Sequence, residues 1–167
     1  MQNLTFYKMK LTSIECVNIV NWIAFHKYNV ALNKTQMQKI LYLIYGIYLS
    51  TTQDKLFVDD TPKAWPFGPV FPRVNKYYKP GVIPSKESLS LNKIEDDTVA
   101  FDIIKYVVDK FYKFSAMKLS EWSHSENGPW YKTVYGEGKS NSEVKWNVEI
   151  SDELIKNYFP KYESRQQ

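Results

Sequence analysis

The spacing of apolar residues along the chain predicts a mainly helical protein. In the first part, apolar side chains recur every three or four residues, which is the period of a helix with one buried face. These residues are Cys16, Ile19, Val20, Ile23 and Ala24. We expect the helix to begin near Thr12 and Ser13, because a hydroxyl there can accept a hydrogen bond from the free N–H groups of the first turn.

A second predicted helix, residues 34–50, is apolar on nearly every side. Asn33 and Gln36 have the spacing of a capping box, in which each side chain accepts a hydrogen bond from the other residue's backbone N–H. One face carries Met37, Ile40, Leu41, Ile44, Tyr45 and Tyr48, and Leu43, Ile47 and Leu49 cover much of the rest. A helix of this kind is buried by several neighbours, so we expect it at the centre of the fold.

Short β elements and further helices follow. Two apolar segments, 56–58 and 63–65, flank a turn-forming stretch at 59–62 and predict a small hairpin. Three prolines within 66–72 exclude regular structure at the start of this segment. Pro69 or Pro72 can nevertheless begin a helix that runs to about Tyr78.

The second half continues mainly as helix. Residues 82–97 have the pattern of a polar connector with a short strand at 88–91. Helices are predicted from Thr98, with Ile104, Val107, Val108 and Phe111 on one face, from Ser115, and over 151–159. The alternation of Val144, Trp146, Val148 and Ile150 with polar residues predicts a half-buried strand at 144–150.

The sequence therefore predicts a compact helical bundle that forms one domain over residues 1–167. There is no internal repeat, no low-complexity tract and no linker long enough to divide the chain, and its length suffices for a core without a disulfide or a structural metal. We expect residues 161–167 to fray.

Charge is distributed unevenly along the chain. Residues 1–83 hold ten Lys/Arg and four Asp/Glu, a net charge of +6, whereas the second half holds twelve and fourteen, a net charge of −2. A basic half can meet nucleic acid or an acidic protein surface. The basic residues are scattered singly and only two are Arg, which disfavours nucleic acid as the partner.

Cellular location follows from what the sequence lacks. The single cysteine, Cys16, cannot form an intramolecular disulfide, and residues 1–8 have no apolar stretch typical of a signal peptide. The longest apolar run, residues 40–49, is about half of a membrane span. We expect a cytoplasmic protein without membrane contact.

Catalytic and metal-binding residues are scarce. His26, His124 and Glu126 could supply the three protein ligands of a catalytic zinc site only if the first helix passed close to the loop after Ser123. Nothing resembles a nucleophile elbow or a phosphate-binding glycine loop. We therefore predict no enzyme activity, no catalytic residue, no metal and no cofactor.

Two loops combine rigid backbone with aromatic side chains. The residues that stand out are Trp65, Phe67, Gly68, Pro69, His124, Glu126, Pro129 and Trp130. In one interpretation the aromatic residues close the ends of the bundle and the prolines stiffen the loops. In the other, the loops present a preformed surface to a protein partner, because Trp and Tyr are the usual anchors of interfaces. His124 and Glu126 would then orient the second loop by hydrogen bonds.

Four segments, in the same order, resemble the motifs of the Panacea antitoxin domain family, which includes SocA-like and phage-associated GepA-like proteins. Residues 34–43 resemble its KLQKLLYL helix and residues 64–70 its AWxYGPV signature. Residues 119–130 are similar to its segment with Thr-His and Pro-Trp, and residues 150–159 to its closing segment. The departures, such as Phe67 for Tyr and Ser123 for Thr, keep size or hydroxyl character.

The resemblance implies an antitoxin that neutralises a cognate protein toxin by direct contact. It also implies that the toxin is encoded by an adjacent gene, and, as in SocA-like members, that the antitoxin delivers the toxin to a cellular protease. The alternative is a DNA-binding or phage-associated regulatory protein, which would show a continuous basic face and salt-dependent binding.

Overall fold

The structure is a computed structural model that describes residues 9–136, 144 and 146–164. The described residues form eight α-helices, one short 3-10 helix and three strands. In chain order these are α1 (Ser13–Tyr28), α2 (Lys34–Thr52), β1 (Lys63–Trp65), β2 (Gly68–Val70), α3 (Pro72–Tyr77), η1 (Lys86–Ser88), α4 (Leu91–Asp96), α5 (Thr98–Phe111), α6 (Ala116–Ser123), α7 (Pro129–Tyr135), β3 (Val148–Glu149) and α8 (Asp152–Tyr158). The protein is therefore mainly α-helical, as the sequence predicts.

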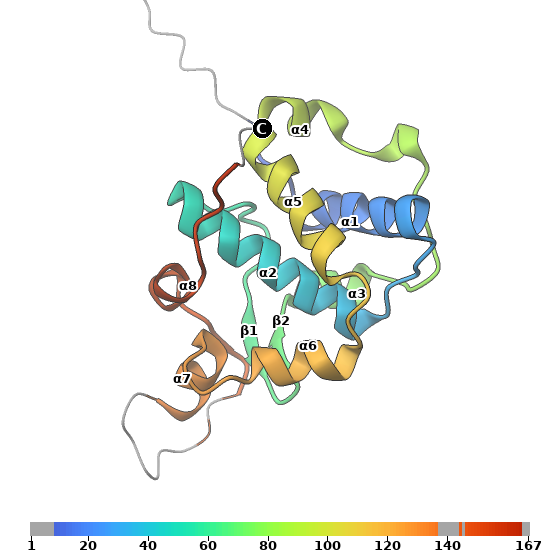
Figure 1. Ribbon diagram of the computed structural model, residues 1–167. Helices are drawn as coiled ribbons and strands as arrows, with labels where there is room; N and C mark the ends of the chain where they lie inside the picture. The colour runs from blue at the N-terminus through green and yellow to red at the C-terminus, as the bar shows by residue number, and fades with distance from the viewer. Residues whose placement is uncertain (1–8, 137–143, 145, 165–167) are drawn as a thin grey trace, which may run out of the picture.

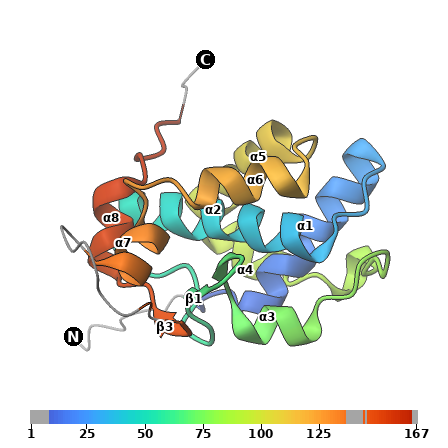
Figure 2. The ribbon, with the colours of Figure 1, turned by 90° about the horizontal axis from the view of Figure 1, so that it is seen from below.

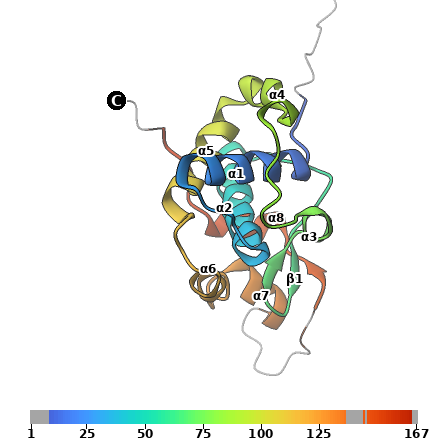
Figure 3. The same cartoon turned by 90° about the vertical axis from the view of Figure 1, so that its right-hand side faces the viewer.

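The central helix is α2, which other elements surround (Figures 1 and 3). Asn33 and Gln36 form the predicted capping box, with N–H···O distances of 2.8 and 2.9 Å. Every residue from Met37 to Ser50 is buried. Helices α1, α5, α6 and α8 and strand β2 all contact α2, so the apolar residues around its circumference face protein and not water.

Local signals also determine where other helices begin. Thr12 and Glu15 form a capping box at α1, and Ser115 caps α6 by accepting from the Lys118 N–H at 3.1 Å. Helix α5 begins after Asp97, and of the four residues predicted to share one face, Ile104, Val107 and Val108 are buried and Phe111 is half-buried. None of the described helices is long and apolar enough to cross a membrane.

The predicted pairing of 56–58 with 63–65 is wrong. Strand β1 instead pairs antiparallel with β2 on one side (Figure 1) and with β3 on the other (Figure 2). Phe57 is fully buried against the rings of Tyr45 and Phe71, and so belongs to the core.

The acidic residues after Phe57 stabilise helix starts instead of a hairpin turn. Asp59 accepts from the N–H and hydroxyl of Ser13 at 2.8 and 2.9 Å, and Asp60 accepts from the Val74 N–H at 3.0 Å. These carboxylates therefore satisfy N–H groups in the first turns of α1 and α3, which lack partners inside their own helices.

Two other strand predictions also need correction. Residues 88–91 belong to the end of η1 and the start of α4, because Leu89 and Ile94 turn into the core. The strand expected over 144–150 is limited to β3 among the described residues. Asn147 has a φ of 58°, a left-handed conformation that interrupts an extended strand, and of the four alternating apolar residues Ile150 alone is buried.

We expected residues 161–167 to fray, but Tyr162 is attached to the rest of the fold. Residues 161–164 have no regular structure, but the Tyr162 N–H donates to Thr51 Oγ1 at 2.8 Å and its ring lies 5.5 Å from that of Tyr106. Residues 165–167 lie outside the described residues, as do residues 1–8, where no signal peptide is expected.

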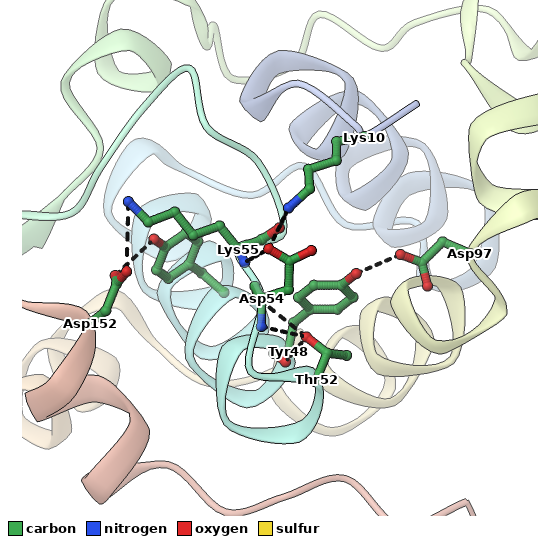
Figure 4. A network of polar contacts seen from close by, with 8 residues as sticks. Lys10, Tyr48, Thr52, Asp54, Lys55, Asp97 and Asp152 are labelled. Carbon is green, nitrogen blue, oxygen red and sulfur yellow. Dashed lines mark hydrogen bonds and ion pairs between the residues drawn. The ribbon is translucent and has the colours of Figure 1, made fainter. Parts of the chain in front are cut away.

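Polar side chains connect four parts of the chain at the C-terminal end of α2 (Figure 4). The Tyr48 hydroxyl donates to Asp97 at 2.6 Å and thereby attaches α2 to the start of α5. Lys10 donates to Asp54 at 2.6 Å, and Lys55 pairs with Asp152 of α8 at 3.6 Å. The network fixes this end of the bundle.

Candidate functional site

The two aromatic loops meet at one end of the molecule. Pro66 and Phe67 form the turn between β1 and β2, and the second loop leads from α6 into α7, with Pro129 in the first turn of α7. The Trp130 indole N–H donates to the Trp65 carbonyl at 2.8 Å, and the indole lies against the His124 ring with centroids 4.2 Å apart. The structure thus brings together residues that are 65 positions apart in the sequence.

Side chains from α2 and α7, together with His124 directly after α6, hold the backbone of residues 65–71. Besides Trp130, Lys39 Nζ donates to the Pro69 carbonyl at 3.0 Å. The Gln38 amide forms two bonds with the backbone of Phe71, accepting from its N–H at 2.8 Å and donating to its carbonyl at 3.2 Å. We refer to Gln38, Lys39, His124 and Trp130 as the hairpin clamp.

The prolines explain why side chains hold this segment. Pro66, Pro69 and Pro72 have no backbone N–H, so the segment cannot form the regular hydrogen bonds of a longer ladder. Buried carbonyl groups nevertheless need donors. Lys39 and Gln38 supply donors from α2, and Trp130 supplies one from α7. The turn is therefore stabilised by groups that are far away in the sequence.

Lys39 is a charged group in the core. It is buried, and burial lowers the pKa of its ammonium to about 8. Its Nζ also lies against Gly68, whose φ is 106°. A Cβ at this glycine would lie 2.8 Å from both Lys39 Nζ and Ser123 Oγ, so only glycine fits both the backbone conformation and the space.

His124 occupies the contact between α6 and the hairpin. Burial and the nearby Lys39 ammonium lower the pKa of the imidazole, while a hydrogen bond to the Phe67 backbone opposes this change. Its Nε2 is buried and has no hydrogen-bond partner among the described residues. A neutral imidazole stacked on Trp130 is the form that fits beside a buried ammonium.

Above the clamp, apolar side chains face solvent. Phe67 is 80% exposed at the tip of the turn, and Trp146 and Val148 are 43% and 40% exposed on the segment that pairs with β1. The half-buried Trp65 connects the two segments, because its indole N–H donates to Asn147 Oδ1 at 3.0 Å. We call Trp65, Phe67, Trp146 and Val148 the hairpin face.

The predicted site residues thus divide into two groups. Gly68, Pro69, Pro129 and Trp130 are buried and support the turn, and His124 is half-buried beneath it. Phe67 and Glu126 are exposed, and Trp65 lies between the groups.

Of the two residues expected to orient the second loop, His124 bonds to the backbone of Phe67 on the hairpin, and Glu126 is exposed. Hydrogen bonds within this loop come instead from Ser125 Oγ to the Trp122 carbonyl at 2.6 Å and from the Gly128 N–H to the Ser125 carbonyl at 2.8 Å. Serine hydroxyls readily form such local bonds to the backbone, and these two bonds tighten the turn that leads into α7.

Sequence reasoning missed the part of the clamp that lies on α2. Gln38 and Lys39 are consecutive polar residues in a helix that we predicted to be buried on several sides. Buried polar groups require partners. Two polar residues in a helix that is otherwise apolar therefore indicate that this turn of α2 contacts polar groups such as backbone carbonyls.

The arrangement offers little chemistry of other kinds. No group of three or more His, Cys, Asp or Glu side chains could hold a metal ion within the described part of the chain. His26 is exposed in the last turn of α1, where its ring lies on Trp22. Cys16 is fully buried, and burial raises the pKa of its thiol. Ser123 donates to the carbonyl of Ser120.

The fold and the site define a small helical domain in which the hairpin clamp holds a turn that carries exposed aromatic side chains. The family model described as antitoxin SocA-like, Panacea domain, matches residues 37–131, which is more than half of the chain. The chain therefore belongs to the SocA-like Panacea domain family. No curated protein and no solved structure is similar enough to the chain to match it.

The motifs that carry the family resemblance correspond to the clamp and the segment it holds. Gln38 and Lys39 come from the first motif, residues 64–70 form the second, and His124 and Trp130 come from the third. The fourth motif, 150–159, lies beyond the matched range. Within it, Phe159 packs its ring against Gly46 of α2.

Proposed function

We propose that this protein is an antitoxin that neutralises a cognate protein toxin by binding the folded toxin through the hairpin face. The observation that carries the proposal is the position of Phe67. A phenyl ring that is 80% exposed stands on a turn whose neighbouring carbonyls are held by Lys39 and Trp130. Large apolar groups kept in water on a rigid support are typical of binding surfaces.

The clamp gives this surface a thermodynamic advantage. Backbone and side chains that are already ordered lose little conformational entropy when a partner docks. Transfer of an exposed phenyl ring into an apolar pocket contributes about 1.5–3 kcal/mol. An interface of standard size, about 1,600 Å², can therefore reach nanomolar affinity.

The proposal extends to the domain, the partner and the mode of action. We place the domain boundary outside the matched residues 37–131, because α1 and α8 pack on α2 within the same hydrophobic core. The toxin is the product of an adjacent gene, and the antitoxin acts in the cytoplasm without catalysis. Delivery of the bound toxin to a cellular protease is a further step that the family resemblance suggests.

Expression of the adjacent gene tests the proposal. The gene is expressed alone and together with this chain, and a tagged form of this chain is used to capture its product. We expect the gene alone to arrest growth, and coexpression to restore growth with recovery of a stoichiometric complex. The proposal fails if no adjacent gene is toxic. It also fails if growth is restored without a complex and through lower transcription of the operon, which would indicate a DNA-binding regulator.

A further inference from the structure

An aromatic pocket lies between α2, α5, α6 and the segment that follows α8. This segment runs back along α2 toward α5 (Figure 1), and the Tyr162 N–H attaches it to Thr51 Oγ1 of α2 at 2.8 Å. The pocket has a volume of about 570 Å³. This volume lies within the usual range of small-molecule sites, about 300–1,000 Å³, and such sites are lined mainly by apolar and aromatic side chains.

The floor of the pocket is part of the hydrophobic core, and its walls are aromatic. Leu43 and Ile47 of α2 and Phe159 form the floor, and each of them is buried. The walls are half-buried aromatic side chains from α5, α6, α8 and the segment after α8, namely Phe111, Trp122, Tyr158 and Tyr162. A planar aromatic ligand in this space would meet both faces and edges of rings, the arrangements that aromatic groups prefer.

An ammonium group lies at the mouth of the pocket and has no described carboxylate partner. Lys110 Nζ donates to the Tyr106 hydroxyl at 3.1 Å and lies 5.4 and 5.7 Å from the ring centroids of Tyr106 and Phe111. Asp109, the residue before it, pairs with Lys27 instead. Contacts with two rings and a hydroxyl thus hold the Lys110 ammonium beside the aromatic walls.

The charge of the pocket favours an anion. Its described lining contains two cations, Lys110 and Lys161, and one acid, Glu163, which gives a net charge of +1. Aromatic walls can also attract a cation. Lys110 already occupies that position over Tyr106 and Phe111, so a second cation would be repelled.

We propose that this pocket binds a small aromatic carboxylate. The rings of the ligand pack among Phe111, Trp122 and Phe159, and its carboxylate pairs with Lys110. This activity is independent of toxin binding, because the pocket uses no residue of the hairpin face or of the hairpin clamp.

Calorimetric titration of the full chain with three probes tests the proposal. The probes are 2-naphthoate, 2-naphthamide, which has nearly the same shape without the charge, and decanoate, which has the charge on an aliphatic chain. We expect 2-naphthoate to bind most tightly. The amide should bind about fivefold more weakly, the upper end for an ion pair at a partly exposed position.

Variants locate the binding to the pocket. Lys110→Met should weaken binding of 2-naphthoate about fivefold and leave binding of 2-naphthamide unchanged. The matched control is Lys105→Met, because Lys105 also lies over a ring of α5, 5.5 Å from the centroid of Phe101, but does not line the pocket. Tyr106→Ala should weaken binding of 2-naphthoate by about 2- to 12-fold, the effect of one aromatic contact. All three side chains are exposed, so the melting temperature should stay unchanged.

Four results would overturn the proposal. The first is no binding of 2-naphthoate at millimolar concentration. The second is tighter binding of decanoate, which would indicate a site for acyl chains. The third is equal affinity of Lys110→Met and Lys105→Met for 2-naphthoate. The fourth is loss of 2-naphthoate binding in Phe67→Ala, which would place the ligand on the hairpin face. Lys110→Met should still neutralise the toxin, so failure of this proposal leaves the proposed antitoxin role untouched.

Discussion

Substitution of Lys39 by methionine removes the buried charge of the hairpin clamp while keeping most of the side-chain volume. Burial lowers the pKa of Lys39 from its ordinary value of 10.5 to about 8. Since one pKa unit corresponds to about 1.4 kcal/mol, keeping this side chain charged at neutral pH costs the folded state about 3 kcal/mol. Lys39→Met avoids this cost but leaves the Pro69 carbonyl without its donor, a loss of about 1–3 kcal/mol.

The two effects nearly cancel at neutral pH but respond differently to pH. Because the pKa of Lys39 is lower in the folded state than in the unfolded state, the unfolded chain binds more protons between pH 8 and 10.5. Stability contributed by this group therefore rises with pH across that window. Relative to Lys39→Met, the wild type should gain about 2 kcal/mol in unfolding free energy between about pH 7 and about pH 9.5.

Urea unfolding of both proteins at the two pH values measures this quantity. Taking the difference between the proteins removes the contributions of the buried tyrosines, which titrate in both. A difference that stays constant with pH would show that Lys39 does not titrate in this window, and a difference of opposite sign would refute the assignment of a buried, charged lysine.

The remaining predictions concern packing and metal content. Trp130→Ala should destabilise the protein by about 3–5 kcal/mol, because it empties a large aromatic site that is 4% exposed, and an unchanged thermal melt would contradict this. Gly46→Ala should cost about 1–3 kcal/mol, because the added Cβ would lie 2.4 Å from a carbon of the buried Phe159 ring. A rise in the melting temperature of this variant would show that helix propensity outweighs the clash. Elemental analysis should find neither zinc nor iron in stoichiometric amount, whereas one equivalent that disappears in His124→Ala would contradict a metal-free protein.

Helix starts could be predicted from the sequence because their signals are local. The hydroxyl cap at Thr12 and the capping box at Asn33 each depend on a residue three positions away, and both form as predicted; Glu15 completes a second capping box at Thr12 that we did not predict. The hairpin could not be predicted in the same way. Its turn at Pro66 and Phe67 contains none of the usual two-residue turn sequences, and it depends on Gly68 at a φ of 106° and on donors from distant helices.

Most residues of the candidate site could be predicted from the sequence, but which of them support the turn and which face solvent could not. Trp65 and Trp130 stand out by type, yet only the fold shows that one indole N–H bonds to the carbonyl of the other residue. Gln38 and Lys39 were overlooked because apolar periodicity gives weight to their neighbours. The exposure of Trp146 was also missed, because alternation predicts a buried face wherever apolar residues recur.

The affinity of the toxin for Phe67→Ala tests the central claim most directly. The matched control is Phe25→Ala, which makes the same change at an exposed phenylalanine near the end of α1. The account predicts that both variants melt as the wild type does, that Phe67→Ala binds the product of the adjacent toxic gene about 30-fold or more weakly and fails to restore growth, and that Phe25→Ala binds normally. Full affinity and full rescue by Phe67→Ala would contradict the claim that the hairpin face is the toxin-binding surface.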